Sequence, residues 1–227
     1  MTYSLIIKPA NGNVDATVGS VEGVRRYAPF EYRLADPDAE IFITLLTSSG
    51  SVELNFCYGG PLEEVTEAIN LAAQLSDLTN APIRDPQAEA TLTASQADLT
   101  RIFESWKSSN RTVLLNYSRG NYYLRIPEGE DGTLVVEAIE CRDAAQRPLN
   151  VARIASALAK ATLWEDAVEV FKVAHSLAPD NTDILWGLAV TLSNLDRSSE
   201  ARKYLKMLLT QKVGDSDALA LLAELDG

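Results

Sequence analysis

The stretch WEDAVEVFKVAHSLAPDN, residues 164–181, decides the architecture of the C-terminal part of the chain. Its apolar side chains recur three and four positions apart, which predicts an amphipathic helix that Pro179 closes. Residues 148–181 and 182–215 form two units of 34 residues, and an internal repeat of this length predicts stacked helical hairpins. The matching pairs are Val151 with Leu185, Ile154 with Leu188, Ala155 with Ala189, Leu158 with Leu192, Ala167 with Ala201, Phe171 with Leu205, and Ala174 with Leu208.

Small residues of the first unit stand where its two predicted helices approach closely, and bulky residues stand where they interlock. The small ones are Ala155, Ala167 and Ala174, and the bulky ones are Leu158, Trp164 and Phe171. On these residues the last third of the chain resembles a pair of tetratricopeptide (TPR) repeats, with a capping helix over residues 216–227. The resemblance implies an all-α, TPR-like helical repeat domain over residues 148–227 that binds a protein partner.

Three positions on the first helix of each unit would face a TPR groove. They are Ala152, Ser156 and Lys160, then Trp186, Val190 and Asn194. Some TPR modules grip an acidic peptide C-terminus with lysine and asparagine at these places, and the absence of that pattern argues against a chaperone-tail adaptor. The resemblance offers Arg153, Lys160 and Trp186 as candidate contact residues. Trp186 is either an aromatic anchor for a partner or a side chain packed against the N-terminal domain or the neighbouring repeat.

The sequence of residues 1–145 predicts an α+β domain in which helices pack on an antiparallel sheet. Short apolar or alternating runs predict its first strands, and TSSGS between the last two predicts a hairpin turn. These strands are expected over residues 4–8, 30–34, 41–46 and 52–58.

Two helices are expected after these strands. One begins at Pro61, and the other spans residues 94–110 with Ser95 and Asp98 as a capping box. The pattern that follows predicts more strands: a hairpin of residues 111–117 and 122–126, and a further strand over residues 134–139.

The charge balance narrows the classes of partner. The net charge is −12, which disfavours binding to nucleic acid or to an anionic membrane surface. Residues 148–227 hold 11 acidic and 8 basic residues, so residues 1–147 hold 21 and 12 and carry a net charge of −9. This acidity either serves solubility alone or attracts a basic protein.

Cytoplasmic localisation is expected because no signal-peptide pattern or apolar span stands out. Cys57 and Cys141 match no zinc or redox spacing, so both are expected as reduced thiols.

Residues that could carry chemistry are few. His175 has no nearby serine–acid or cysteine constellation with which it could act in catalysis. Gly59 and Gly60 precede a helix, but Glu63 and Glu64 would repel a phosphate there. EGEDG at residues 128–132 lacks the length of a calcium loop and is interpreted as a hairpin turn. No enzyme activity, cofactor or metal site is therefore predicted.

A second resemblance concerns residues 63–89, in which a helix with a Leu-Ala-Ala-x-Leu core leads into Asp85-Pro86-Gln87 after a hairpin. This arrangement resembles immunity-type domains encoded beside bacterial polymorphic toxins. The resemblance implies a bacterial immunity protein that neutralises a basic toxin through acidic residues. The candidates are Glu63, Glu64, Glu128, Glu130 and Asp131.

Two other functional classes stay open. The first is a TPR adaptor, or a secretion or assembly chaperone, that holds a peptide or helix of its partner. The second is an enzyme with a TPR accessory.

Overall fold

The computed structural model describes residues 2–10, 14–36, 41–48, 50–58, 60, 62–125 and 137–226. Contacts within the chain divide it into two compact units: Met1–Thr112 with Arg125–Glu137, and Val113–Leu124 with Ala138–Gly227. This division groups residues 113–124 with the C-terminal helices and so differs from a boundary at residues 145–148. Compactness alone does not show that a part folds by itself, so the domain bounds given above stay a prediction.

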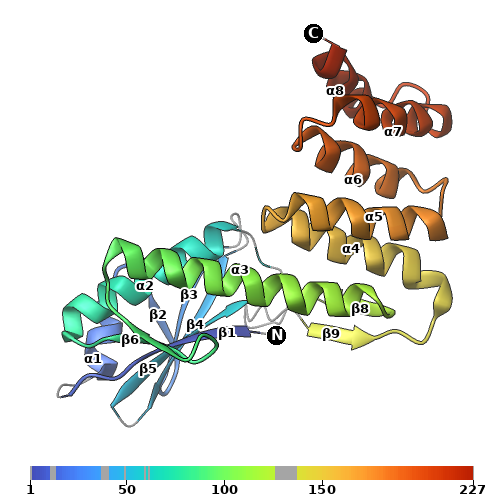
Figure 1. Cartoon of the computed structure of the whole chain (residues 1–227). Coiled ribbons are helices and arrows are strands. Elements are labelled where there is room, and N and C mark those ends of the chain that lie inside the picture. The colour runs from blue at the N-terminus through green and yellow to red at the C-terminus, as the bar shows by residue number, and fades with distance from the viewer. Residues whose placement is uncertain are drawn as a thin grey trace. The chain divides into compact units, whose positions relative to one another are not determined.

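The first unit is built on a seven-stranded antiparallel sheet with the strand order β2-β3-β4-β5-β1-β6-β7 (Figure 1). The strands are β1 Thr2–Ile7, β2 Arg25–Ala28, β3 Glu31–Asp36, β4 Ile41–Ser48, β5 Ser51–Cys57, β6 Ile83–Asp85 and β7 Ala90–Leu92. The strands predicted over residues 4–8, 30–34, 41–46 and 52–58 correspond to β1, β3, β4 and β5, and the hairpin closes where Ser48 faces Ser51.

Alternation along the central strands explains why one face of the sheet is buried. In β1, Tyr3, Leu5 and Ile7 are fully buried while the residues between them are partly exposed. In β5, Val52 and Leu54 repeat the pattern. Side chains two apart lie on one face of a strand, so this alternation supplies a continuous apolar surface.

Helix α2, Leu62–Thr79, packs on β1, β4, β5 and β6. Its buried stripe recurs at helical spacing and includes Val65, Ala68, Ala72 and Leu75. The shorter α1, Val14–Gly19, contacts α2. A helix was predicted to begin at Pro61, which itself lies outside the described residues.

Helix α3, Gln96–Ser118, overturns the hairpin that the sequence predicts at residues 111–126. Residues 111–117 look strand-like because they are rich in Val, Leu, Thr and Tyr, but they continue a helical face. Buried residues recur four apart along that face, at Ile102, Trp106, Asn110 and Leu114. The polar run Ser108–Asn110 conceals the continuity, because Asn110 is itself buried.

Two short strands follow α3: β8, Tyr122–Arg125, and β9, Glu137–Glu140, pair as a separate two-stranded sheet. The strand predicted over residues 134–139 therefore begins outside the described residues, and its described part lies in β9.

The rest of the second unit is a stack of helix pairs, coloured from yellow to red in Figure 1. After a 3-10 turn at Ala144–Gln146 come α4 Arg147–Lys160, α5 Trp164–Leu177, α6 Thr182–Ser193, α7 Ser198–Gln211 and α8 Ser216–Asp226. The starts of α5 and α7 are 34 residues apart, and so are those of α6 and α8. Each helix contacts the next one along the chain, and α4 also contacts α6, which is how stacked repeats share one core.

Equivalent positions of the two 34-residue repeats are buried to the same extent. Val151, Ile154, Ala155 and Leu158 in α4 are fully buried, and so, within 1%, are Leu185, Leu188, Ala189 and Leu192 in α6. The end of α3 joins the first of these cores, because Leu114 lies in one apolar cluster with Val151 and Phe171. The prediction that a helical repeat region follows the α+β region along the chain is therefore confirmed.

Candidate protein-binding surface of the helical repeats

The surface that remains for a partner is made by residues that the stacking does not bury. On α4 these include Arg153 and Lys160, both exposed and seven residues apart, so they lie on the same side of the helix two turns apart. The guanidinium carbon of Arg153 lies 4.8 Å from the ring centroid of Tyr123, which is itself exposed. A cation–π interaction of this kind holds the guanidinium over the ring while its charge stays exposed.

Trp186 on α6 is partly buried rather than free. It packs against the apolar cluster formed by Leu185, Ala189, Leu205, Leu208 and Ala218. The structure thus supports packing on the neighbouring repeat for part of this side chain. Further along α6, the amide of Asn194 donates a hydrogen bond of 2.9 Å to the carbonyl of Val190, which holds that polar group close to the helix.

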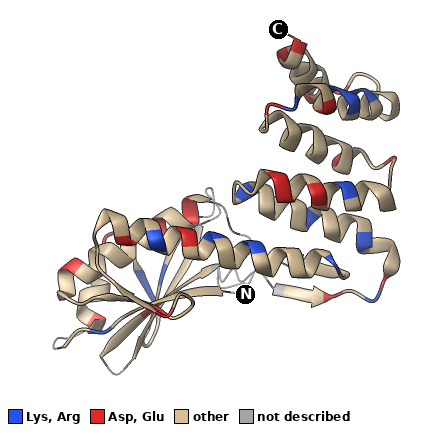
Figure 2. Ribbon diagram, in the orientation of Figure 1, with Lys and Arg blue, Asp and Glu red and all other residues tan. Residues whose placement is uncertain are grey.

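Charge changes sign along the row of first helices α4, α6 and α8 (Figure 2). Helix α4 carries Arg147, Arg153 and Lys160 and no acidic residue. Helix α6 carries a single acid, Asp183, and α8 carries only acids, at Asp217, Glu224 and Asp226. A partner that lies along these helices therefore meets a basic end and an acidic end, which would fix its direction.

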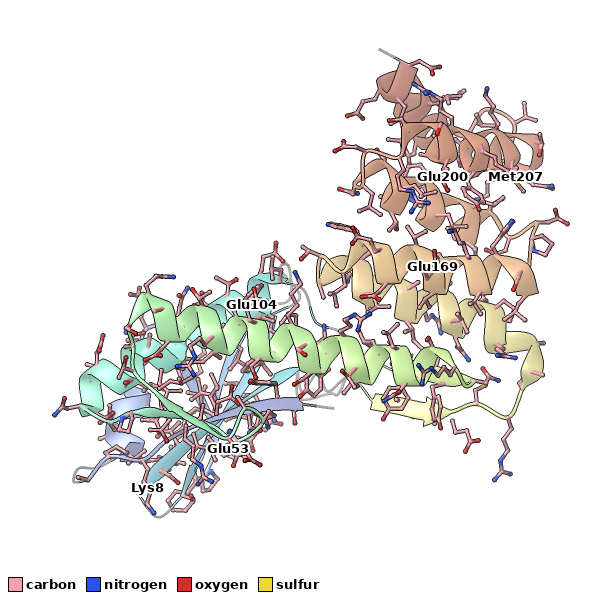
Figure 3. The ribbon with its side chains drawn as sticks, viewed as in Figure 1. Lys8, Glu53, Glu104, Glu169, Glu200 and Met207 are labelled. Carbon is pink, nitrogen blue, oxygen red and sulfur yellow. The ribbon has the colours of Figure 1, made fainter. Side chains whose placement is uncertain are left out.

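Some of the charges on and beside the second helices, α5 and α7, form ion pairs with each other. Lys172 donates to Glu169 at 2.8 Å on α5, and Arg197 donates to Glu200 at 2.7 Å on α7; Figure 3 labels both acids. The hydrogen bonds with Arg197 lower the pKa of Glu200, and the same pairing raises the pKa of Arg197. Each of these ion pairs joins a basic side chain to an acid three residues away.

The acidic residues that the sequence offers for a toxin-binding surface differ in their exposure. Glu63 on α2 is exposed, as the prediction requires. Glu64 is only 2% exposed, and its carboxylate lies against Gly60, where an ideal Cβ would come 2.8 Å from Oε2. Its charge is therefore turned inward and not offered to a partner. Glu128, Glu130 and Asp131 lie outside the described residues.

In the Asp85-Pro86-Gln87 turn, the side chain of Asp85 has a structural role. Asp85 is fully buried, and its Oδ1 accepts hydrogen bonds from the backbone N–H of Gln87 at 3.0 Å and of Ala88 at 3.1 Å. Its other oxygen accepts from the hydroxyl of Tyr3, which is also hydrogen-bonded to Ser105 at 2.7 Å. Sequence reasoning recognised the turn but not its link to β1 and α3, because those partners are 82 and 20 residues away in the chain.

Groups suited to chemistry do not converge in the part of the chain that the structure describes. No set of three or more His, Cys, Asp or Glu residues there could hold a metal ion. His175 stacks edge-on against Tyr204, with ring centroids 5.5 Å apart, and so joins α5 to α7. None of the described helices has both the length and the apolar character needed to cross a bilayer.

Comparison with known protein families agrees with the geometry of the repeats. The family model described as "Tetratricopeptide repeat" matches residues 158–225. A solved structure named "MamA AMB-1 P212121" is 14% identical over 72% of each chain, with a TM-score of 0.36. No curated protein matches the chain. The match spans α5, α6, α7 and most of α8, and tetratricopeptide repeats are a class of solenoid that presents extended binding surfaces to other proteins.

Proposed function

We propose that this protein is a non-catalytic adaptor that holds a protein partner on the exposed side of its first helices. The observation that carries the proposal is the pairing of a 34-residue helical repeat with a row of first helices whose charge runs from basic α4 to acidic α8. Arg153 and Lys160 are the proposed contacts on α4, and the exposed part of Trp186 adds apolar area on α6.

The test is affinity capture from the native cells with a matched pair of variants. Arg153→Glu with Lys160→Glu reverses the charge of α4 at two exposed positions. Lys203→Glu with Lys206→Glu makes the same change at two exposed positions of α7. We expect a stoichiometric partner that the first variant loses and the second retains. Equal capture by both variants would place the partner elsewhere and overturn the α4 assignment.

A narrower candidate is neutralisation of a basic toxin in the bacterial cytoplasm by the acidic N-terminal part. It is supported by the net charge of −9 over residues 1–147 and by the exposure of Glu63. Glu128, Glu130 and Asp131 are its other proposed contacts. If it holds, changing these three acids to lysine abolishes growth rescue in cells that express the partner, whereas the α4 double variant still rescues. The reverse outcome favours the adaptor.

A further inference from the structure

Two arginines of the first unit lie over a tyrosine ring and are also held by an acid. The sets are Arg26 with Tyr32 and Asp15, and Arg33 with Tyr27 and Glu31. In the second set the guanidinium carbon lies 3.3 Å from the ring centroid, and a guanidinium nitrogen lies 2.7 Å from the carboxylate. The ring contacts the flat face of the guanidinium, so the N–H groups at its edge can donate to the acid.

Arg153 on α4 is stacked on Tyr123 in the same way, but the described residues do not supply the acid. None of the ion pairs between described residues includes Arg153. Arg153 is exposed, so a carboxylate from another molecule can reach its guanidinium. Because the ring already restricts the side chain, less conformational entropy is lost when an acid binds.

Tyr123 belongs to an exposed apolar pair on the ribbon that β8 and β9 form. The backbone N–H of Cys141 donates to the carbonyl of Asn121 at 2.7 Å, so the strands run antiparallel and Tyr123 lies opposite Ile139. Opposite side chains of such a pair lie on one face, with Cβ atoms about 5 Å apart. Tyr123 is 37% exposed and Ile139 is 42% exposed. We call Arg153, Tyr123 and Ile139 together the ribbon surface.

The ribbon packs on the helices with its other face. The ring of Tyr122 lies 4.8 Å from that of Tyr117 on α3, and Leu124 packs against the core of the first repeat. Side chains alternate along a strand, so Tyr123 points away from this packing. The ribbon surface is therefore not needed to hold β8 and β9 in place.

The charges near the ribbon surface favour an anion. Residues 138–160 hold four basic and two acidic residues, although the whole chain carries a net charge of −12. Of the two acids, Asp143 caps the turn before α4, where its Oδ1 accepts from the N–H of Ala145 at 2.9 Å. Glu140 alternates with Ile139 and so belongs to the other face of the ribbon. An acidic partner therefore meets the exposed cation of Arg153 without competition from these two acids.

We propose that the ribbon surface binds an acidic segment of the partner protein, in which aspartate or glutamate stands next to a large apolar residue. The carboxylate takes the place beside Arg153 that Glu31 takes beside Arg33. The apolar side chain covers Tyr123 and Ile139, and its burial adds affinity. This proposal rests on the proposed function, because it gives the chemistry of the partner that α4 holds.

A phage-displayed library of random linear peptides tests this chemistry. The library is first depleted on the full chain with Arg153→Glu and then selected on the unchanged full chain. We expect the selected peptides to be enriched in aspartate or glutamate next to leucine, isoleucine, phenylalanine or tryptophan. Enrichment of basic peptides, enrichment without that pairing, or no enrichment overturns the proposal.

Variants of the full chain then locate the binding of the most enriched peptide, which is followed by fluorescence anisotropy. Arg153→Gln and Tyr123→Ser should each weaken binding at least about tenfold, whereas Tyr123→Phe keeps the ring and should not. Lys203→Gln is the matched control, because exposed Lys203 lies 5.8 Å from the ring centroid of Tyr204 on α7. Ile139→Ser replaces Tyr123→Ser if that variant does not fold, as judged by circular dichroism. Unchanged affinity in Arg153→Gln, or an equal loss in Lys203→Gln, overturns the assignment.

Capture of the native partner separates this proposal from the proposed function. We expect the partner to be lost both by Arg153→Glu with Lys160→Glu and by Tyr123→Ser with Ile139→Ser. If only the first variant loses it, α4 holds the partner and the proposal for the ribbon surface fails alone. If both variants retain it, the proposed function and this proposal fail together.

Discussion

At the scale of single residues, Asp85 is the polar centre of the first unit. It ties the turn after β6 to β1 through Tyr3, and its buried carboxylate satisfies two backbone N–H groups. A buried acceptor of this kind stabilises only while its partners remain, because removing it leaves donors unsatisfied in a dry environment.

Asp85→Ala should therefore lower the free energy of unfolding by about 2–4 kcal/mol. Asp85→Asn keeps one acceptor oxygen and nearly the same shape, so its loss should be smaller. Urea denaturation followed by circular dichroism measures both. A loss in Asp85→Ala no larger than in the exposed control Asp77→Ala would contradict this account.

Tyr3 gives the same cluster a signature on the alkaline side. Burial, then the hydrogen bond to Asp85, raises the pKa of Tyr3 above its ordinary value of 10.0. The folded state keeps this phenol protonated while the unfolded state releases the proton, so the stabilisation is complete below about pH 10 and declines as the pH rises further. Urea unfolding from about pH 8 to about pH 11 should show this decline.

The matched variants for this decline are Tyr3→Phe and Tyr27→Phe. Tyr3→Phe removes the titrating group and should flatten part of the slope. Burial also raises the pKa of Tyr58 and of Tyr32, so these two residues keep part of the slope in that variant. Tyr27→Phe removes a phenol that is 45% exposed and serves as the matched control. Identical slopes in the two variants would exclude Tyr3 as the cause.

At the scale of elements, the junction between α5 and α6 depends on a glycine. An ideal Cβ at Gly187 would lie 2.4 Å from Cζ of Phe171, whose ring is buried in the core of the first repeat. Alanine is the better helix former by about 1 kcal/mol, but the overpacking it would cause here costs about 1–3 kcal/mol.

Gly187→Ala is accordingly expected to lower the melting temperature despite its higher helix propensity. Calorimetry of the single variants and of Gly187→Ala in a Phe171→Leu background checks the cause. The smaller leucine should make the alanine tolerable, so the double variant should lose less than the two single losses combined. Additive losses would show that the ring is not responsible.

The helices also show how far sequence reasoning reaches. The repeat was predictable because equivalent positions of α4 and α6 are buried in the same way, so that apolar residues recur 34 positions apart in the sequence. The end of α3 was not, because Asn110 is polar yet fully buried, and a local reading ends the helix there. The capping box was found in part: Ser95 accepts from the N–H of Asp98, but the carboxylate of Asp98 accepts from Thr93. The direction of a side chain toward a distant partner leaves no local mark, and Glu64 was misjudged for that reason.

At the scale of the whole molecule, the excess of acids sets the behaviour in solution. With a net charge of −12 and a pI near 4.6, copies of the chain repel one another at neutral pH and lose that repulsion as the carboxylates are protonated. Light scattering across the acid range should show association that rises as the pH approaches the pI of the chain. A variant in which Asp180, Asp183, Asp196 and Glu165 are all replaced by lysine has a higher pI, so it should associate less than the unchanged chain at that pH. A scattering profile without a maximum near the pI would contradict this expectation.

The two inter-repeat junctions of the stack are keyed by different sizes of side chain. Phe171 meets Gly187 at the first junction, whereas 34 residues further on Leu205 shares a cluster with Leu221. Moving α5 into the place of α7 would set a phenyl ring against leucine, and the opposite exchange would leave a void over glycine. The two repeats are therefore not interchangeable, because the side chains at each junction fit only their own neighbours.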